Sequence, residues 1–333
     1  MRATDDPMGE RPMISAEVVV GRSDRLSEDS VGSIYRSSED TAGSIDRLSD
    51  AADRPRSWRE LLAETTAAVG SSQDARRLVE EASGYEGAEV FTHLDERATA
   101  RSGAYLSTMV RRRIAGEPLQ YVLGRWGFRA LDLMVDSRVL IPRPETEQVV
   151  GWAIEAARRL DRERLVAADL GTGSGAIALS LAVELGAEVW ATDVSPDALD
   201  VARANLSGIG MWAATRVRIV EGSWWSALPD ELRGRLDVVV SNPPYVGEHD
   251  PLPSEVRDHE PVLALRAGTD GMDSIAKVVS GAPAWLTPGG VLVVELAPPQ
   301  ASPAVARARS AGADRVEVRT DALGRERALV AQW

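Results

Sequence analysis

Residues Asp237-Val-Val-Val-Ser-Asn-Pro-Pro-Tyr245 decide the fold that this sequence predicts. Three consecutive valines are typical of a parallel β-strand that is buried on both faces. Pro243 and Pro244 have no backbone N–H to donate, so the hydrogen-bond ladder of a sheet must end before them. The sequence therefore predicts a strand followed by a stiff turn. In open α/β sheets, such strand ends are where ligands bind.

This turn offers hydrogen-bond acceptors to a flat NH2 group. The side-chain carbonyl of Asn242 and the backbone carbonyl of Pro243 have no obligatory partner in the sheet, and together they can bind both hydrogens of one NH2 group. Tyr245 supplies an aromatic face against which an amide or a base can lie. We therefore expect Asn242, Pro243, Pro244 and Tyr245 to bind the substrate. The alternative is a rigid turn without chemistry.

A glycine-rich turn follows an earlier buried strand, residues 165–170. Gly171-Thr-Gly-Ser-Gly175 leads into a helical pattern over residues 176–185, and glycine lets the backbone approach a ligand closely at a helix N-terminus. Asp193 ends the next strand, 20 residues after Gly173. An acidic residue at that place commonly accepts hydrogen bonds from ribose hydroxyls. This unit of strand, glycine-rich turn, helix, strand and acid predicts an adenosine-bearing cofactor. By itself it does not exclude NAD as that cofactor.

Strands and helices continue to alternate towards the C-terminus. A third strand is predicted over residues 217–220, and Trp224 just after it either packs on adenine or belongs to the core. Residues 248–260 form a long loop rich in proline and acid, of the kind that often covers a binding site. A helix over 273–285 and a strand over 291–296 follow. Two final strands, 316–320 and 328–332, predict an antiparallel hairpin on a parallel sheet.

Composition limits the class of protein. A chain of 333 residues allows one large domain and a smaller one, and a net charge of −13 argues against binding naked nucleic acid. Without cysteine there are no disulfides or thiolate metal sites. Three histidines without ligand spacing predict no metal site. We expect a cytoplasmic protein, because the N-terminus is unlike a secretory signal and no apolar run approaches the ~20 residues that cross a membrane.

The chain divides into four predicted parts. Residues 1–55 are polar and are predicted to be a disordered extension. Residues 56–117 have helical spacing of apolar residues and predict a small helical bundle. Residues 118–143 predict a linker with a β-hairpin, strands 126–128 and 131–135. Residues 144–333 form the main domain, which begins with a helix whose first position suits Pro144.

The motifs resemble those of the bacterial release factor glutamine methyltransferases, which are class I S-adenosylmethionine-dependent enzymes. The similar stretches extend from about residue 116 to the end, and they are GEPLQYVLGRWGF, IPRPETE, DLGTGSGAIALSLA, ATDVSPDALDVARANL, VVVSNPPYV, DHEPVLAL and DALGRERALV. The resemblance implies an α/β class I methyltransferase fold: a Rossmann-like, mostly parallel seven-stranded sheet with a terminal antiparallel hairpin. A small helical-bundle domain that recognises the substrate would precede it.

The resemblance also implies roles for single residues. Five would wrap the methionine part of S-adenosylmethionine: Gly171, Thr172, Gly173, Ser174 and Gly175. Asp193 would bind the ribose hydroxyls, and Trp224 would lie beside the adenine. Asn242, next to the cofactor, would hold the substrate glutamine with Pro243 and Tyr245. The implied reaction is N5-methylation of the glutamine in the Gly-Gly-Gln motif of peptide chain release factors. We expect a monomer without direct nucleic-acid or membrane partners.

Other readings of the same motifs remain open. A related enzyme class methylates glutamine in a ribosomal protein, and enzymes that methylate amino groups of DNA or RNA bases have closely similar tetrapeptides. A module that binds the cofactor without activity is a further alternative. Two positions depart from the family's pattern: Ser223 stands where an acidic residue commonly precedes the tryptophan, and Ala297 stands where glycine is frequent.

Overall fold

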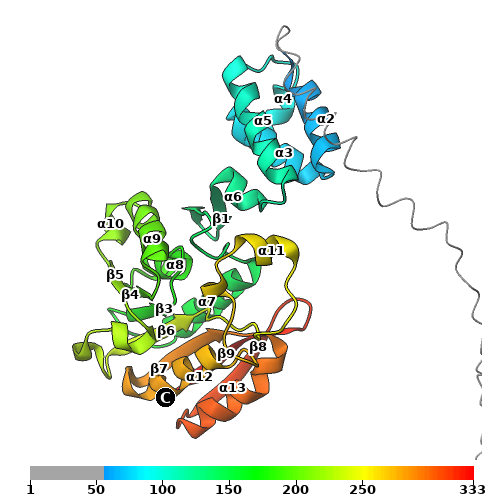
Figure 1. Ribbon diagram of the computed structural model, residues 1–333. Helices are drawn as coiled ribbons and strands as arrows, with labels where there is room; N and C mark the ends of the chain where they lie inside the picture. The colour runs from blue at the N-terminus through cyan, green and yellow to red at the C-terminus, as the bar shows by residue number, and fades with distance from the viewer. Residues whose placement is uncertain (1–55) are drawn as a thin grey trace, which may run out of the picture. The chain divides into compact units, whose positions relative to one another are not determined.

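The computed structural model describes residues 56–333, and Figure 1 shows the course of the chain. The predicted disorder of residues 1–55 lies outside the described residues. Within the described part of the chain, no helix is both long and apolar enough to cross a membrane.

The first described segment is helical, as predicted. Its helices are α2 (Trp58–Val69), α3 (Ser72–Ser83), α4 (Glu89–Thr92), α5 (Ala100–Ile114) and α6 (Leu119–Leu123). Ser57 and Glu60 form a capping box at the start of α2, and Gly70 ends this helix at φ 71°. Helix α5 begins at Ala100, after the N-cap Thr99.

A short β-hairpin follows, at the predicted place. Strands β1 (Arg125–Phe128) and β2 (Leu131–Met134) pair antiparallel. Helix α6 lies within the segment that we expected to lead into this hairpin without helical structure. This helix has five residues and ends at Gly124, whose φ is 74°. The segment from residue 118 therefore begins as a helix and only then becomes a hairpin.

A seven-stranded sheet organises the rest of the described residues, in the order β5-β4-β3-β6-β7-β9-β8. The strands β3, β4, β5, β6 and β7 are parallel, and β9 pairs antiparallel with both β7 and β8. This arrangement confirms the predicted fold class. The strands are β3 (Val166–Leu170), β4 (Glu188–Asp193), β5 (Val217–Glu221), β6 (Leu236–Ser241), β7 (Leu286–Glu295), β8 (Arg315–Thr320) and β9 (Glu326–Gln332).

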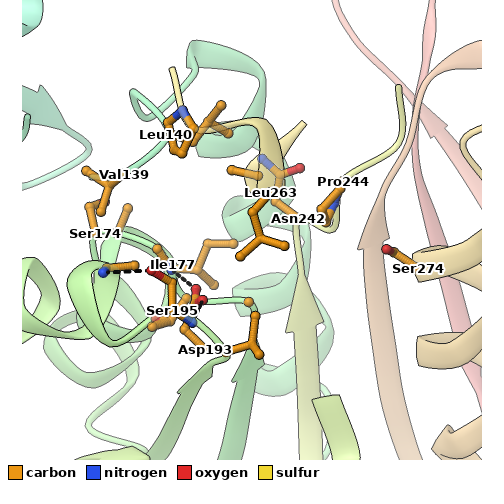
Figure 2. Close-up of a pocket in the computed structure, with 18 of the residues that line it drawn as sticks. Val139, Leu140, Ser174, Ile177, Asp193, Ser195, Asn242, Pro244, Leu263 and Ser274 are labelled. Atoms are coloured by element: carbon orange, nitrogen blue, oxygen red, sulfur yellow. Dashed lines mark hydrogen bonds between the residues drawn. The ribbon is translucent and has the colours of Figure 1, made fainter. Parts of the chain in front are cut away.

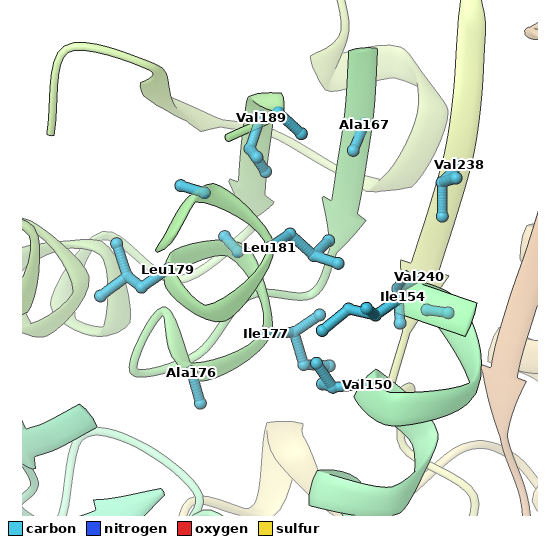
Figure 3. Close-up of a cluster of buried hydrophobic side chains, with 14 of the residues drawn as sticks. Val150, Ile154, Ala167, Ala176, Ile177, Leu179, Leu181, Val189, Val238 and Val240 are labelled. Atoms are coloured by element: carbon cyan, nitrogen blue, oxygen red, sulfur yellow. The ribbon is translucent and has the colours of Figure 1, made fainter. Parts of the chain in front are cut away.

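Helices cover both faces of this sheet. The helices of this part of the chain are α7 (Pro144–Arg158), α8 (Ala176–Leu185), α9 (Pro196–Gly208), α10 (Met211–Ala214), α11 (Ser254–His259), α12 (Asp273–Gly281) and α13 (Pro298–Ser310). Helix α11 lies in the connection that follows β6 and has no buried residue. On one face, α7 and α8 pack on the strands through a cluster that includes Val150, Ile154, Leu181 and Val240 (Figure 3). On the other face, α12 and α13 contribute residues to a second cluster. Residues of β6 are buried throughout, because the strand lies between these two layers.

Four elements differ from the sequence expectation. The predicted loop at residues 248–260 contains the short helix α11. Helix α12 ends at Gly281 rather than near residue 285. Strand β7 begins at Leu286 and runs through Pro288-Gly-Gly, whereas a strand from residue 291 was predicted. Helix α13, which begins with Pro298, had not been predicted at all.

Gly281 allows a close approach between α12 and the buried Trp225 ring. A Cβ at this glycine would lie 2.3 Å from the Cδ1 and Nε1 atoms of Trp225. The ring is held there by stacking on Trp285 and by donating a hydrogen bond to the Lys277 carbonyl at 3.1 Å. We therefore expect Gly281→Ala to lower the free energy of unfolding by about 1–3 kcal/mol in urea titrations.

Gly103→Ala is the matched control for this substitution. Gly103 lies inside α5, and no atom of the described residues comes within 4 Å of a Cβ built there. Alanine lowers the conformational entropy lost in a helix, so this variant should be about 0.5–1 kcal/mol more stable than the wild type. A wild-type urea midpoint for Gly281→Ala would contradict the packing argument.

Candidate active site

A cavity of about 380 Å³ lies at the carboxyl ends of the central parallel strands. The chain runs from β3 outward to β5 on one side and returns through β6 on the other, so the strand order reverses between β3 and β6. In open α/β sheets, this reversal opens the crevice where ligands bind. Figure 2 shows Asp193 and Ser195 on one side of the cavity and Asn242 and Pro244 on the other.

The glycine-rich turn forms the floor of this cavity. Gly171, Gly173 and Gly175 have φ values of 81°, 54° and 87°, a region that favours glycine. A Cβ at Gly173 would meet no atom of the described residues within 4 Å, so the backbone there borders open space. Gly175 is the N-cap of α8, and the turn therefore leads directly to a helix N-terminus.

A buried carboxylate beneath the turn fixes its shape. Asp169 accepts hydrogen bonds from the Thr172 hydroxyl at 2.6 Å and from the Ala178 backbone N–H at 3.0 Å. Its other oxygen, Oδ1, has no hydrogen-bond partner among the described residues. Complete burial raises the pKa of Asp169 to about 7, since the charged form is poorly solvated there.

Asp193 connects the glycine turn to the start of α9. Its Oδ2 accepts from the Gly173 backbone N–H at 2.9 Å, and its Oδ1 accepts from the Ser195 backbone N–H at 2.9 Å. Burial raises the pKa of Asp193. Each carboxylate oxygen has further acceptor capacity, and the side chain lines the cavity. The carboxylate can therefore accept hydrogen bonds from neighbouring hydroxyls of a ligand.

Trp224 has an unusual backbone conformation at the cavity wall. Its φ is 48°, a left-handed value that costs a bulky residue free energy. Its ring lies 3.5 Å from the position of a Cβ built on Gly171, which places the ring over the glycine turn. Trp224 also packs against buried residues of the second core cluster. The ring thus borders both the cavity and the core, and strain held in this way is typical of functional sites.

Asn242 presents its carbonyl oxygen as an unpaired acceptor. Its Nδ2 donates a hydrogen bond to the Thr146 hydroxyl at 3.1 Å, so the NH2 end of the amide faces Thr146. The Oδ1 atom is shielded from water and has no partner among the described residues. A buried acceptor without a partner costs about 1–3 kcal/mol. The NH2 group of a ligand would satisfy it.

The hydrogen bonds continue from Asn242 through Thr146 to Glu295, at the end of the neighbouring strand β7. Thr146 donates its hydroxyl proton to Glu295 Oε2 at 2.7 Å, and the Tyr245 hydroxyl lies 3.5 Å from Glu295 Oε1. Glu295 is 2% exposed. Burial is the main cause that raises the pKa of Glu295 to about 7; the Thr146 hydrogen bond opposes the shift, and the nearby Glu145 carboxylate contributes to it.

The structure brings most of the sequence-predicted site residues to one cavity. Eight of them line it: Gly171, Thr172, Gly173, Ser174, Asp193, Trp224, Asn242 and Pro244. Pro243 is buried, and burial raises the pKa of the Tyr245 hydroxyl, which points to Glu295. These two residues and Gly175 adjoin the cavity-lining residues in sequence.

Sequence reasoning missed Thr146 and Glu295. Thr146 is part of the IPRPETE stretch, in which only Pro144 was interpreted, as the first residue of a helix. Glu295 ends β7, where Val294 pairs with Ser241 of the neighbouring strand β6. An acidic residue at the carboxyl end of a buried strand was the signal for it, as it was for Asp193.

The residues of the cavity fit an adenosine-bearing cofactor. The open space at Gly173 leaves room for a ligand against the backbone, and Asp193 supplies acceptors suited to a pair of hydroxyls. Trp224 supplies an aromatic face, and the volume lies in the range of small-molecule sites, about 300–1,000 Å³. Within residues 56–333, no group of three or more acidic, histidine or cysteine side chains is placed to hold a metal ion.

Two family models match the chain. The PrmC N-terminal domain model matches residues 56–124, which hold the helices from α2 to α6. The methyltransferase small domain model matches residues 157–254, which hold the glycine turn, Asp193 and Asn242.

Curated relatives match over most of their lengths. A release factor glutamine methyltransferase of Deinococcus radiodurans is 40% identical over 280 residues, which are 81% of this chain and 96% of that protein. One of Xylella fastidiosa (strain Temecula1) is 42% identical and covers 77% of this chain and 91% of that protein. One of Streptomyces coelicolor is 48% identical over 58% of this chain and 67% of that protein. Among solved structures, a methyltransferase from Pyrococcus furiosus is 20% identical with a TM-score of 0.45, over 61% of this chain and 88% of that chain.

Proposed function

Because the chain belongs to the release factor glutamine methyltransferase family, we propose that it methylates a glutamine of peptide chain release factors. The methyl donor is S-adenosylmethionine, and the acceptor is the N5 atom of the glutamine side chain in the Gly-Gly-Gln motif. The observation that carries this proposal is the buried, unpaired Oδ1 of Asn242, a residue that lines one cavity together with the glycine turn and Asp193.

The protein's own residues bind and orient the reactants. S-adenosylmethionine, when bound, supplies a methyl group on a positively charged sulfur, which makes that methyl strongly electrophilic. The turn from Gly171 to Gly175 would hold its methionine part, Asp193 its ribose hydroxyls, and Trp224 its adenine. This division of roles agrees with the positions of Gly173, Asp193 and Trp224 around one cavity.

Asn242 and Pro243 act on the nucleophile. The lone pair of an amide nitrogen is delocalised into its carbonyl, so the glutamine needs both activation and alignment. By accepting the two N–H groups, Asn242 Oδ1 and the Pro243 carbonyl increase electron density on the nitrogen and fix its direction. Orientation of this kind can contribute about 7–11 kcal/mol to catalysis. Fixed dipoles in a site that excludes water add to it. Tyr245 would border the substrate amide. After methyl transfer, the amide nitrogen loses one of its N–H protons to solvent, because an N-methylated amide cation is very acidic.

The helical region supports a protein substrate. Residues 56–117 form a compact set of helices beside the catalytic machinery in sequence, and we propose that they recognise the body of the release factor. Release factors act in the cytoplasm, so we propose the same location for this protein. The net charge of −13 fits a protein substrate better than naked nucleic acid.

Methyl transfer from labelled S-adenosylmethionine to a purified release factor tests this function. We expect label in the wild-type release factor and none in a release factor whose Gly-Gly-Gln glutamine is changed to alanine. Equal label in both substrates would place the reaction at another residue. Label in neither, with cofactor binding intact, would exclude release factors and favour a ribosomal protein or an RNA as substrate.

A further inference from the structure

Three side chains from distant parts of the chain form a continuous line of hydrogen bonds that begins at the cavity, which Asn242 and Thr146 line. Asn242 Nδ2 donates to Thr146 Oγ1 at 3.1 Å, and Thr146 Oγ1 donates to Glu295 Oε2 at 2.7 Å. Thr146 comes from the first turn of α7, Asn242 from the end of β6, and Glu295 from the end of β7. Thr146 and Glu295 are 4% and 2% exposed, so water does not compete for these bonds.

This line decides which end of the Asn242 amide faces the substrate. The oxygen and the nitrogen of an amide are similar in size, so the surrounding hydrogen bonds determine the orientation. A threonine hydroxyl has one proton. While Thr146 gives this proton to Glu295, it can only accept from Asn242, and it must therefore face the NH2 end. The Oδ1 end is left as the acceptor for the substrate NH2 group.

We propose that Thr146 and Glu295 are positioning residues for methyl transfer, and that the ionised Glu295 carboxylate holds the Asn242 amide in its productive orientation through Thr146. This inference rests on the proposed function for its consequence in catalysis. Thr146 and Glu295 themselves need not touch substrate or cofactor. Their effect is on the direction of the hydrogen bonds.

Protonation of Glu295 would reverse the direction of these hydrogen bonds. A protonated carboxyl has a proton to donate, and Thr146 at 2.7 Å is a nearer acceptor than the Tyr245 hydroxyl at 3.5 Å. Thr146 would then turn its own proton towards Asn242, whose amide has to flip to accept it. The flipped amide presents NH2 to the substrate NH2, and these two donors repel each other.

The groups around Glu295 place this change near neutral pH. Burial raises the pKa of Glu295 to about 7, Glu145 on α7 raises it, and Arg327 on β9 and the Tyr245 hydroxyl lower it. An acid with this pKa loses its charge as the pH falls through 7. We therefore expect kcat to fall as the pH is lowered from 8 to 6, with the loss centred near 7.

Substitutions separate positioning from folding. Thr146→Val keeps the shape of the side chain without the hydroxyl, and we expect kcat to fall about thirtyfold while the affinity for S-adenosylmethionine stays unchanged. Thr146→Ser keeps the hydroxyl and should retain most of the wild-type kcat. Glu295→Gln cannot change its charge with pH, so its kcat should show no step near pH 7. Wild-type kcat in Thr146→Val, an equal loss in Thr146→Ser, or a wild-type pH step in Glu295→Gln would each overturn the proposal.

A measurement on the amide itself does not depend on any substrate. The sequence contains two asparagines, Asn205 and Asn242, so 15N-asparagine labelling gives two side-chain NH2 signals. We expect the Asn242 signal to shift with a midpoint near pH 7 in the wild type, and to stay constant in Glu295→Gln and Thr146→Val. Asn205 donates to the backbone carbonyls of Met134 and Ser174, and its signal should stay constant in all three proteins. A constant Asn242 signal in the wild type would refute the proposal even if methyl transfer to release factors were confirmed.

Discussion

Asn242→Ala is expected to reduce methyl transfer to a release factor about a thousandfold, the loss seen when one preorganised hydrogen-bonding group is removed from an active site. The alanine removes the unpaired Oδ1 acceptor of Asn242, a residue that lines the cavity. It leaves the glycine turn and Asp193 in place, so the affinity for S-adenosylmethionine should equal that of the wild type. Single-turnover kinetics measure the first effect, and isothermal titration with the cofactor measures the second.

Ser241→Ala is the control for this variant. Ser241 is the preceding residue, is fully buried, and donates its hydroxyl proton to the Leu170 carbonyl at 2.6 Å. Its loss should cost about 1 kcal/mol of stability with little effect on the rate of transfer. Loss of cofactor binding in Asn242→Ala would contradict the separate roles of Asn242 and the glycine turn.

Asp193→Ala should weaken the binding of S-adenosylmethionine about a hundredfold, which corresponds to ~3 kcal/mol. The substitution removes the acceptors offered to the ribose hydroxyls. It also removes the partners of the Gly173 and Ser195 backbone N–H groups, so the glycine turn loses a support. Hydrogen bonds to a charged group are worth about 1.5–3 kcal/mol each, which accounts for the size of the effect. Isothermal titration gives the dissociation constant directly.

The nearby Asp197 provides the matched control. It is exposed in the first turn of α9, where an acidic side chain favours the helix dipole. Asp197→Ala removes the same charge from the same segment and should leave cofactor affinity unchanged. If Asp193→Ala bound the cofactor as tightly as this control, the ribose-binding role of Asp193 would be wrong.

Much of the fold followed from local patterns. The valines of β6 and the helix beginning at Pro144 were predicted at their places, because each depends on a few neighbouring residues. The elements that differed were short or marked by proline. Helix α13 contains Pro298 and Pro303, which hide its helical character from propensity alone.

The sequence by itself determined three features: the glycine turn, the acid that follows it and the turn that carries Asn242. Each of these is a run of residues whose backbone conformation is set by its own composition. Only the tertiary structure decided that Thr146 and Glu295 are linked to Asn242 by hydrogen bonds. They lie 96 and 53 positions from it in the chain. Their hydrogen bonds exist because β6 and β7 are neighbours in register and α7 begins beside their ends. The left-handed backbone of Trp224 was likewise decided by packing, since no local preference of tryptophan favours it.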